Sequence, residues 1–208
     1  GARINELAQL LLDDIAELDG VPVVRINDEG DKRTKTPAST RTVPLHPSLI
    51  AAGLLTYKEV ITAEGWHRLF PELTKSKAAK SGYGAAPSEH FTAYRRQTGV
   101  SPNVDRQKVF HSFRTTANSA LRYLDVPLER RQRLVGHEPS DTNNSDYRPS
   151  DREKMFPIAT LLQDMTLLNF GLTHPTYIDR PRHQQERLRA ARRRANGDQR
   201  GEPADLVA

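Results

Sequence analysis

Cysteine is absent from the chain, so the protein can have neither a disulfide framework nor a thiolate metal site. Aromatic residues make up only 6% of the sequence, and no apolar run approaches the length that crosses a bilayer. A basic-then-apolar leader is also missing from the start of the chain. We therefore expect a soluble protein of a reducing compartment, with no membrane partner.

Length and charge indicate one globular domain with a polyanionic partner. The chain has 208 residues, of which 36% are hydrophobic, and this suits a single domain with a sizeable core. Its formal net charge is +5 and its pI is near 9.6. A basic balance of this kind favours a polyanion such as nucleic acid, although much of the excess lies after Asp179. We find no internal repeat.

The stretch from 108 to 147 carries the most informative polar residues. Apolar residues recur in it at helical spacing, which predicts a helix with one buried stripe. The members of this stripe are Phe110, Phe113, Ala117, Leu121 and Leu124. His111 and Arg114 lie beside the stripe, three residues apart, so a rigid helix would hold both polar groups on neighbouring positions.

A second, shorter helix is expected to follow the first. Pro127 suits its first turn, Asp125 is available to cap it, and Gly136 is typical of the residue that ends a helix. His137 comes next, and Tyr147 stands ten positions later. The second helix would therefore end directly at a histidine.

The beginning of the chain predicts a helix from 3 to 18. Ile4, Leu7, Leu11 and Ile15 repeat at helical spacing within it. Arg3 and Glu6 are three residues apart, so the carboxylate can orient the guanidinium.

A small antiparallel sheet is predicted next, with strands at Val21–Ile26 and Arg41–Leu45. The loop between the strands carries Lys35 at a mobile tip, where an ammonium group can reach a substrate. Lys32 is the alternative candidate for the same role. The plainer interpretation is that the basic residues of this loop protect an exposed sheet edge.

The other expected elements are mostly helical. They comprise one or two helices over 46–63 broken near Gly53, an apolar cluster from Trp66 to Leu73, a basic loop over 75–84, and helices over 89–99 and 152–170.

These motifs together resemble the active-site half of the tyrosine recombinases, the phage-integrase group. The chain opens with G-x-R-x-x-E-L, continues with the lysine hairpin around Lys35, and then has H-x-x-R, L-V-G-H and Tyr147 in that order. The resemblance implies an α+β catalytic domain over 1–172, mainly helical with a small antiparallel β-sheet, of the DNA breaking-rejoining type. It also implies that an N-terminal DNA-binding segment is absent from this chain. Residues 173–208 would form a basic, partly disordered tail.

The resemblance implies a role for each matching residue. Tyr147 would attack a phosphodiester and form a covalent 3′-phosphotyrosine, although its phenol has a pKa of about 10 and so a handicap of about 4 kcal/mol near neutral pH. Arg3 and Arg114 would hold the non-bridging oxygens of the phosphate. His111 would accept the phenolic proton or bond to the phosphate, and His137 would donate a hydrogen bond to a phosphoryl oxygen. Lys35 would protonate the leaving 5′ oxygen.

The resemblance also implies partners and a location. Double-stranded DNA is the expected substrate, on which the protein would assemble as a homo-oligomer, a tetramer. No metal and no other cofactor is required. The expected location is the cytoplasm of a prokaryote, associated with the nucleoid.

Other functions stay open at this point. A DNA-binding protein that kept the fold without cleavage, or an enzyme like a type IB topoisomerase, would share most of these residues. A metal-dependent nuclease is disfavoured because His137 and Glu138 lack a second histidine at the position of Asp141. Tyr123 and Tyr177 are alternative nucleophiles, but the first lies within a predicted helix and the second between prolines.

Overall fold

The computed structural model describes residues 1–76, 82–100, 109–137 and 155–171. In this part of the chain there are seven α-helices and one three-stranded antiparallel sheet. The predicted α+β class is therefore confirmed. Tyr147, Tyr177, the tail over 173–208 and part of the basic loop over 75–84 lie outside the described residues. None of the described helices combines the length and the apolar character needed to span a bilayer.

The sheet has the order β1-β2-β3, with β2 (Val21–Ile26) in the centre. β1 (Ile15–Leu18) pairs with it antiparallel through a two-residue turn, Asp19 and Gly20, whose φ angles are 51° and 74°. Positive φ at both positions is the geometry that matches the twist of a tight hairpin. β3 (Arg41–Pro44) pairs on the other side, with Val24 opposite Val43. Both predicted strands are thus confirmed, and β1 is additional.

The predicted helix over 3–18 is wrong beyond its first turns. The helix α1 covers only Ile4–Ala8, and a single 3-10 turn, Leu12–Asp14, leads from it into β1. Apolar residues do repeat at helical spacing through this segment. Ile15 to Leu18 instead pair with β2, and Ile15 is buried in the core, so tertiary contacts override the helical periodicity.

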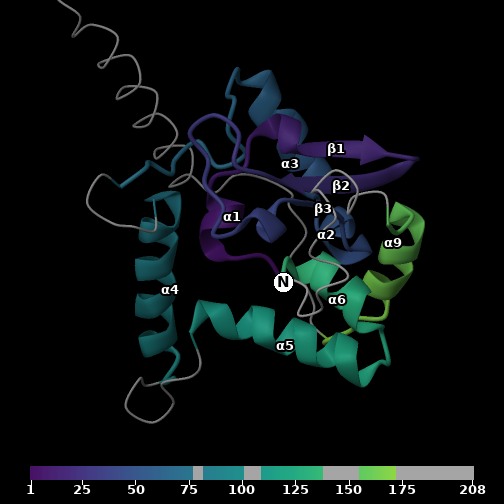
Figure 1. Ribbon diagram of the computed structural model, residues 1–208. Coiled ribbons are helices and arrows are strands. Elements are labelled where there is room, and N and C mark those ends of the chain that lie inside the picture. Colours follow the sequence, from purple (N-terminus) through teal and green to yellow (C-terminus); the bar gives the residue numbers. More distant parts are fainter. Residues whose placement is uncertain (77–81, 101–108, 138–154, 172–208) are drawn as a thin grey trace, which may run out of the picture.

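The helices after the sheet agree more closely with expectation. α2 (Pro47–Ala51) and α3 (Leu54–Ala63) are separated at Gly53, where φ is 90°. α4 (Ala85–Gln97) begins four residues earlier than predicted, directly after the 3-10 turn Gly82–Gly84. In Figure 1 it stands beside the rest of the molecule, at the left of the view.

The last three helices are α5 (Phe110–Tyr123), α6 (Leu128–Val135) and α9 (Ile158–Thr166). Gly136 ends α6 in the left-handed conformation, as predicted. Asp125 does not cap α6, since its own φ is 58° and the helix has no side-chain cap bond. α9 is shorter than the predicted helix over 152–170.

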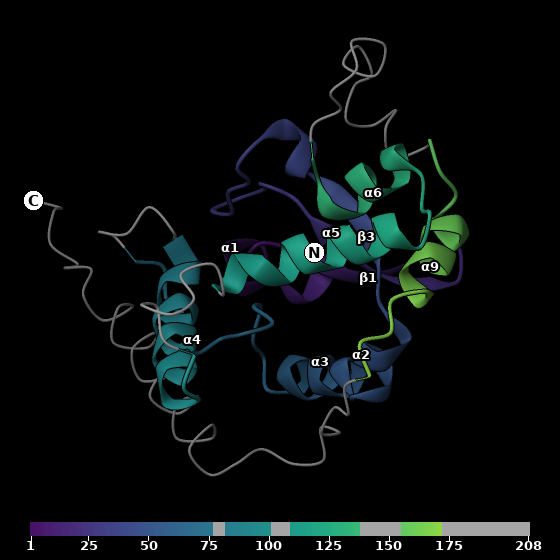
Figure 2. The same cartoon turned by 90° about the horizontal axis from the view of Figure 1, so that it is seen from below.

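The core lies between the sheet and the helices that cover it. Figure 2 shows α2 and α3 on one side of the sheet and α6 on the other. β3 is an edge strand, yet all four of its residues are buried, because α6 and α9 pack against it. The most deeply buried side chains include Val23, Ile61, Leu69, Leu121 and Val135.

The apolar stripe predicted on α5 is only partly correct. Ala117 and Leu121 are buried, but Phe113 is 60% exposed and Leu124 is 40% exposed. Phe113 packs edge-on against Phe91 of α4 and Phe110, away from the sheet. The inward face of α5 instead includes Arg114, which is 2% exposed. The helix therefore turns a charged residue toward the interior, and this requires partners for it.

Candidate functional site

The site is built around the single carboxylate of Glu6 on α1. Its Oε1 accepts a hydrogen bond from Arg3 Nη1 at 2.6 Å, and its Oε2 accepts one from the Arg3 amide at 2.9 Å. The hydrogen bond from the Arg3 backbone N–H is one half of a capping box, in which a glutamate in the first turn of a helix accepts from the N–H of the N-cap residue. A third bond comes from Arg41 Nη2 to Oε2 at 3.0 Å. Glu6 is 2% exposed, and burial opposes its ionisation, but the charge and hydrogen bond of Arg41 and the bonds from Arg3 hold its pKa below the ordinary value.

Arg41 joins β3 to the end of α6. Besides Glu6, it donates from Nη1 to the Ser39 carbonyl at 2.6 Å and from Nε to the Leu134 carbonyl at 3.1 Å. The last carbonyls of a helix have no partner within the helix and carry partial negative charge, which a guanidinium satisfies. Gly136 leaves the space for this contact, since a Cβ there would lie 2.5 Å from Arg41 Nη1.

Arg114, on α5, also binds the C-terminal end of α6. Its Nη2 donates to the Gly136 carbonyl at 3.2 Å and its Nη1 donates to the Gly1 carbonyl at 2.6 Å. Figure 1 shows the N-terminus lying between α1 and α6, where this contact forms. Arg114 Nε is buried and has no hydrogen-bond partner among the described residues. A guanidinium has five N–H donors, and these two hydrogen bonds use two of them.

The three arginines perturb one another because only one carboxylate balances them. Burial, followed by the charges of Arg3 and Arg41, lowers the pKa of Arg114 to about 10, and Glu6 opposes this only in part. Burial is also the main cause of the lowered pKa of Arg41. The cluster of Arg3, Arg41 and Arg114 with Glu6, called the arginine cluster below, carries an excess of two positive charges.

His137 and His111 adjoin the arginine cluster. The pKa of His137 is lowered by burial and then by the charges of Arg114, Arg3, Arg41 and His111, in that order. His137 therefore lies within electrostatic range of the three arginines and of His111. Both histidines are exposed to solvent, so their rings are accessible to a ligand. Of the four residues expected to converge on one basic cleft, Arg3, His111 and Arg114 thus lie within electrostatic range of His137. Only Arg3 and His111 of the four line the groove described next.

Lys35 lies in a groove beside Arg3 and His111. This groove, of about 600 Å³, is lined by Arg3, Glu6, Lys35 and His111, together with neighbouring residues of α1, the β2–β3 loop and the start of α5. Lys35 is exposed, which leaves its ammonium free to enter the groove.

Lys32, the alternative to Lys35, is held elsewhere. Its Nζ lies 2.7 Å and 2.9 Å from the two carboxylate oxygens of Asp14, and the residue is 4% exposed. Asp14 is further bonded by the Leu11 amide and by Asn27. An ammonium in a buried ion pair of this kind cannot reach a substrate without leaving a buried carboxylate unpaired.

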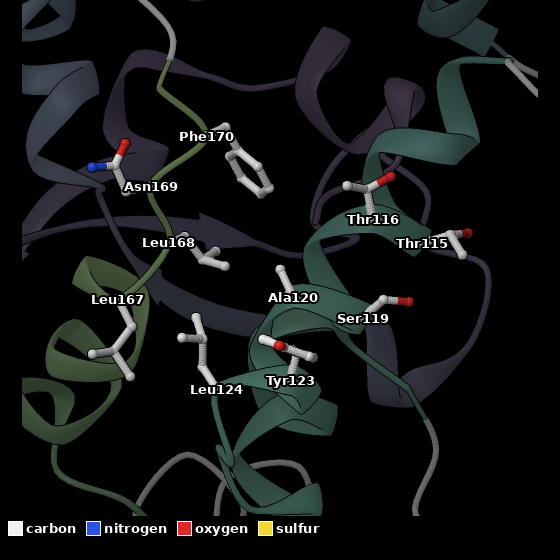
Figure 3. Close-up of a pocket in the computed structure, with 10 residues that line it drawn as sticks. All are labelled: Thr115, Thr116, Ser119, Ala120, Tyr123, Leu124, Leu167, Leu168, Asn169 and Phe170. Atoms are coloured by element: carbon white, nitrogen blue, oxygen red, sulfur yellow. The ribbon is translucent and has the colours of Figure 1, made fainter.

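Tyr123, the alternative nucleophile, faces a different part of the molecule. It is 89% exposed and stands at the end of α5, about 18 Å along the helix axis from His111 at 1.5 Å per residue. It lines a second cavity of about 620 Å³ between α5 and the segment Leu167 to Phe170, shown in Figure 3. This cavity contains none of the arginines or histidines of the site.

Arg41 is the site residue that motif reasoning missed. It was predicted only as the first residue of the strand Arg41–Leu45. The usable signal was its position, because an arginine in a strand of otherwise buried residues must have a buried partner. That partner is Glu6, whose carboxylate also binds Arg3. Among the described residues, no group of three or more His, Asp or Glu side chains could hold a metal ion.

Tyr147 lies outside the described residues, so the arrangement above comprises Arg3, Lys35, His111, Arg114 and His137, with Arg41 added. Comparison of the chain with protein-family models, curated proteins and solved structures finds no match. The function has to be argued from the chemistry of these side chains.

Proposed function

We propose that the protein is a tyrosine recombinase: an α+β catalytic domain of the DNA breaking-rejoining type that cuts and rejoins double-stranded DNA through a phosphotyrosine. The observation that carries this proposal is the arginine cluster, in which three guanidiniums share one buried carboxylate. Burying like charges together costs stability, and proteins retain such an arrangement where a ligand supplies the missing negative charge.

The charge of the cluster suits a phosphodiester in the course of reaction. A phosphodiester carries one negative charge, and attack by an oxygen nucleophile places further negative charge on the non-bridging oxygens. The excess of two positive charges in the cluster balances that state better than the ground state. Interactions that strengthen in the transition state are the ones that accelerate a reaction.

The remaining residues supply proton transfers. His137 is held toward its neutral form by its lowered pKa, and a neutral imidazole can accept or donate one hydrogen bond to a phosphoryl oxygen or a phenol. Lys35 is an exposed cation in the groove beside Arg3 and His111, where it can protonate a leaving 5′ oxygen. Tyr147 is the proposed nucleophile, ten residues after His137.

The test is covalent trapping on a nicked suicide DNA substrate, followed by denaturing electrophoresis. The wild-type protein should form an adduct, and Tyr147→Phe should lose it while binding DNA normally. Tyr94→Phe on α4, 57% exposed and outside the groove, is the matched control and should behave as wild type. Arg114→Ala should keep DNA binding, but its activation free energy for cleavage should rise by about 3 kcal/mol or more, as for the loss of one oxyanion-hole donor.

Three outcomes would contradict the proposal. If Tyr147→Phe still forms the adduct, another tyrosine is the nucleophile. If the wild-type protein binds DNA but forms no adduct on any nicked site, the fold serves binding alone. Relaxation of supercoiled DNA without strand exchange would indicate an enzyme of the type IB topoisomerase class instead.

A further inference from the structure

The loop that carries Lys35 is held by a buried amide of α1. Gln9, at the end of α1, is 2% exposed. Its Nε2 donates to the carbonyl of Arg33 at 3.0 Å, and its Oε1 accepts from the amide of Arg33 at 3.0 Å. The Gln9 side chain therefore pairs with Arg33 as a neighbouring strand would. Asn5 Nδ2 donates to the same Oε1 at 3.1 Å, which fixes the orientation of the Gln9 amide.

The chain on the other side of Lys35 is held by α1 as well. Arg3 Nη1 donates to Ser39 Oγ at 2.9 Å, and Ser39 Oγ shares a hydrogen bond of 3.1 Å with Thr36 Oγ1. Lys35 therefore sits on a short span between two attachments, one at Arg33 and one at Thr36. Both attachments lead to the helix that presents Arg3.

The earlier part of the loop has separate anchors. Lys32 is paired with Asp14, and Asp31 accepts hydrogen bonds from Tyr83 and Arg68, each at 2.6 Å. These contacts fix where the loop leaves β2 and would persist if Gln9 were changed. Among the described residues, the hydrogen bonds to the main chain of Arg33, two residues before Lys35, come from Gln9. Its loss should therefore free the loop tip more than the loop base.

We propose that Gln9 is a positioning residue that sets where the Lys35 ammonium lies relative to the leaving oxygen. This inference rests on the proposed function, since it assigns Gln9 a part in the proton transfer made by Lys35. A glutamine suits the position because its amide offers a donor and an acceptor to one peptide unit at the same time. Neither a carboxylate nor an apolar side chain of the same length can do so.

The variant that tests the proposal is Gln9→Met, which keeps the length of the side chain and removes both hydrogen bonds. Its rate of single-turnover cleavage is compared on two nicked substrates, one with an ordinary phosphate and one with a 5′-bridging sulfur, whose departure needs no proton. Ile61→Val, in the core on α3 and 0% exposed, is the control for a general loss of stability. Hydrogen exchange at the Arg33 amide reports the bond independently of activity.

Gln9→Met should slow cleavage of the phosphate substrate on the order of tenfold to a hundredfold, as a displacement of about 1 Å can. It should cleave the sulfur substrate at nearly the wild-type rate, and its Arg33 amide should exchange faster. Ile61→Val should affect both substrates alike. Equal slowing of both substrates by Gln9→Met, or no slowing, overturns the positioning role while leaving the proposed function intact. A wild-type protein that cleaves neither substrate overturns both.

Discussion

Replacing Glu6 by glutamine removes the one negative charge of the arginine cluster and keeps the volume of the side chain. The carboxylate accepts three hydrogen bonds, two from guanidiniums and one from the Arg3 amide. The neutral amide of Glu6→Gln can still accept at its oxygen, but its NH2 group would face a guanidinium donor. Arg3, Arg41 and Arg114 would then repel one another without compensation.

The expected cost follows from burial. Glu6 is 2% exposed and Arg41 is 3% exposed, so solvent screens their interaction weakly. Removing one partner of a buried pair typically costs about 3 to 5 kcal/mol, and the remaining oxygen acceptor places Glu6→Gln near the lower end. Domains of this size are stable by about 5 to 15 kcal/mol, so the loss is a large share of the total.

Urea unfolding followed by circular dichroism measures this loss. Glu17→Gln, on the exposed face of β1, is the matched control and should change the free energy of unfolding by no more than about 0.5 kcal/mol. A loss below about 1 kcal/mol for Glu6→Gln would refute the reasoning, because the carboxylate would then be dispensable to the cluster.

The same pair of variants gives a pH test. Burial alone would raise the pKa of Glu6, but the charge and hydrogen bond of Arg41 and the bonds from Arg3 outweigh it and hold the pKa below its ordinary value. The stabilisation from ionised Glu6 is therefore present above the unfolded pKa of about 4.3 and is lost as pH falls through the lower folded value. Glu6→Gln should lack that part of the acid-induced loss of folding stability, as urea unfolding at several pH values would measure.

Two further predictions concern the end of α6. Gly136→Ala should destabilise the protein by about 1 kcal/mol or more beyond Gly30→Ala. Both glycines have φ near +65°, but only a Cβ at Gly136 would meet Arg41, at 2.5 Å. Equal losses in urea unfolding would show that the Arg41 side chain can move aside at no cost. The pKa of His137 is lowered by burial and by Arg114, so the folded state binds fewer protons, and stability should fall as pH drops below about 6.5 until the folded pKa is passed. A His137 proton signal that titrates at or above 6.5 by NMR would contradict this, and inorganic phosphate bound at the cluster should raise the pKa.

Local motifs predicted most of what the structure brings together. Val21–Ile26 is rich in β-branched residues and forms the central strand, and the strand predicted at Arg41–Leu45 pairs with it. His111 and Arg114, three residues apart, lie on α5, and Gly136 ends α6 at a positive φ as its place in the motif predicted. These features depend on residues close in sequence, so short-range patterns carry them.

The failures involve contacts made with residues outside the segment that carried each pattern. The periodicity from Ile4 to Ile15 predicted one helix, but the pairing of β1 with β2 decided the outcome. The stripe on α5 placed Phe113 in the core, whereas the inward face is taken by Arg114 because Gly1 and Gly136 supply carbonyls for it. No pattern within a single segment specifies such partners.

The sequence separation of the hydrogen bonds that complete the arginine cluster indicates when the cluster forms during folding. Arg114 reaches Gly1 across 113 positions of the chain, and Arg41 reaches Leu134 across 93. The sheet closes through neighbours in sequence, whereas contacts of such long range form late because the entropy of closing large loops must be overcome first. During synthesis, the earlier part of the chain can therefore acquire its hairpin while the arginine cluster is still incomplete. The contacts of Arg41 and Arg114 with the end of α6 can form only once α6 has left the ribosome, so unfinished chains carry the sheet without the complete cluster.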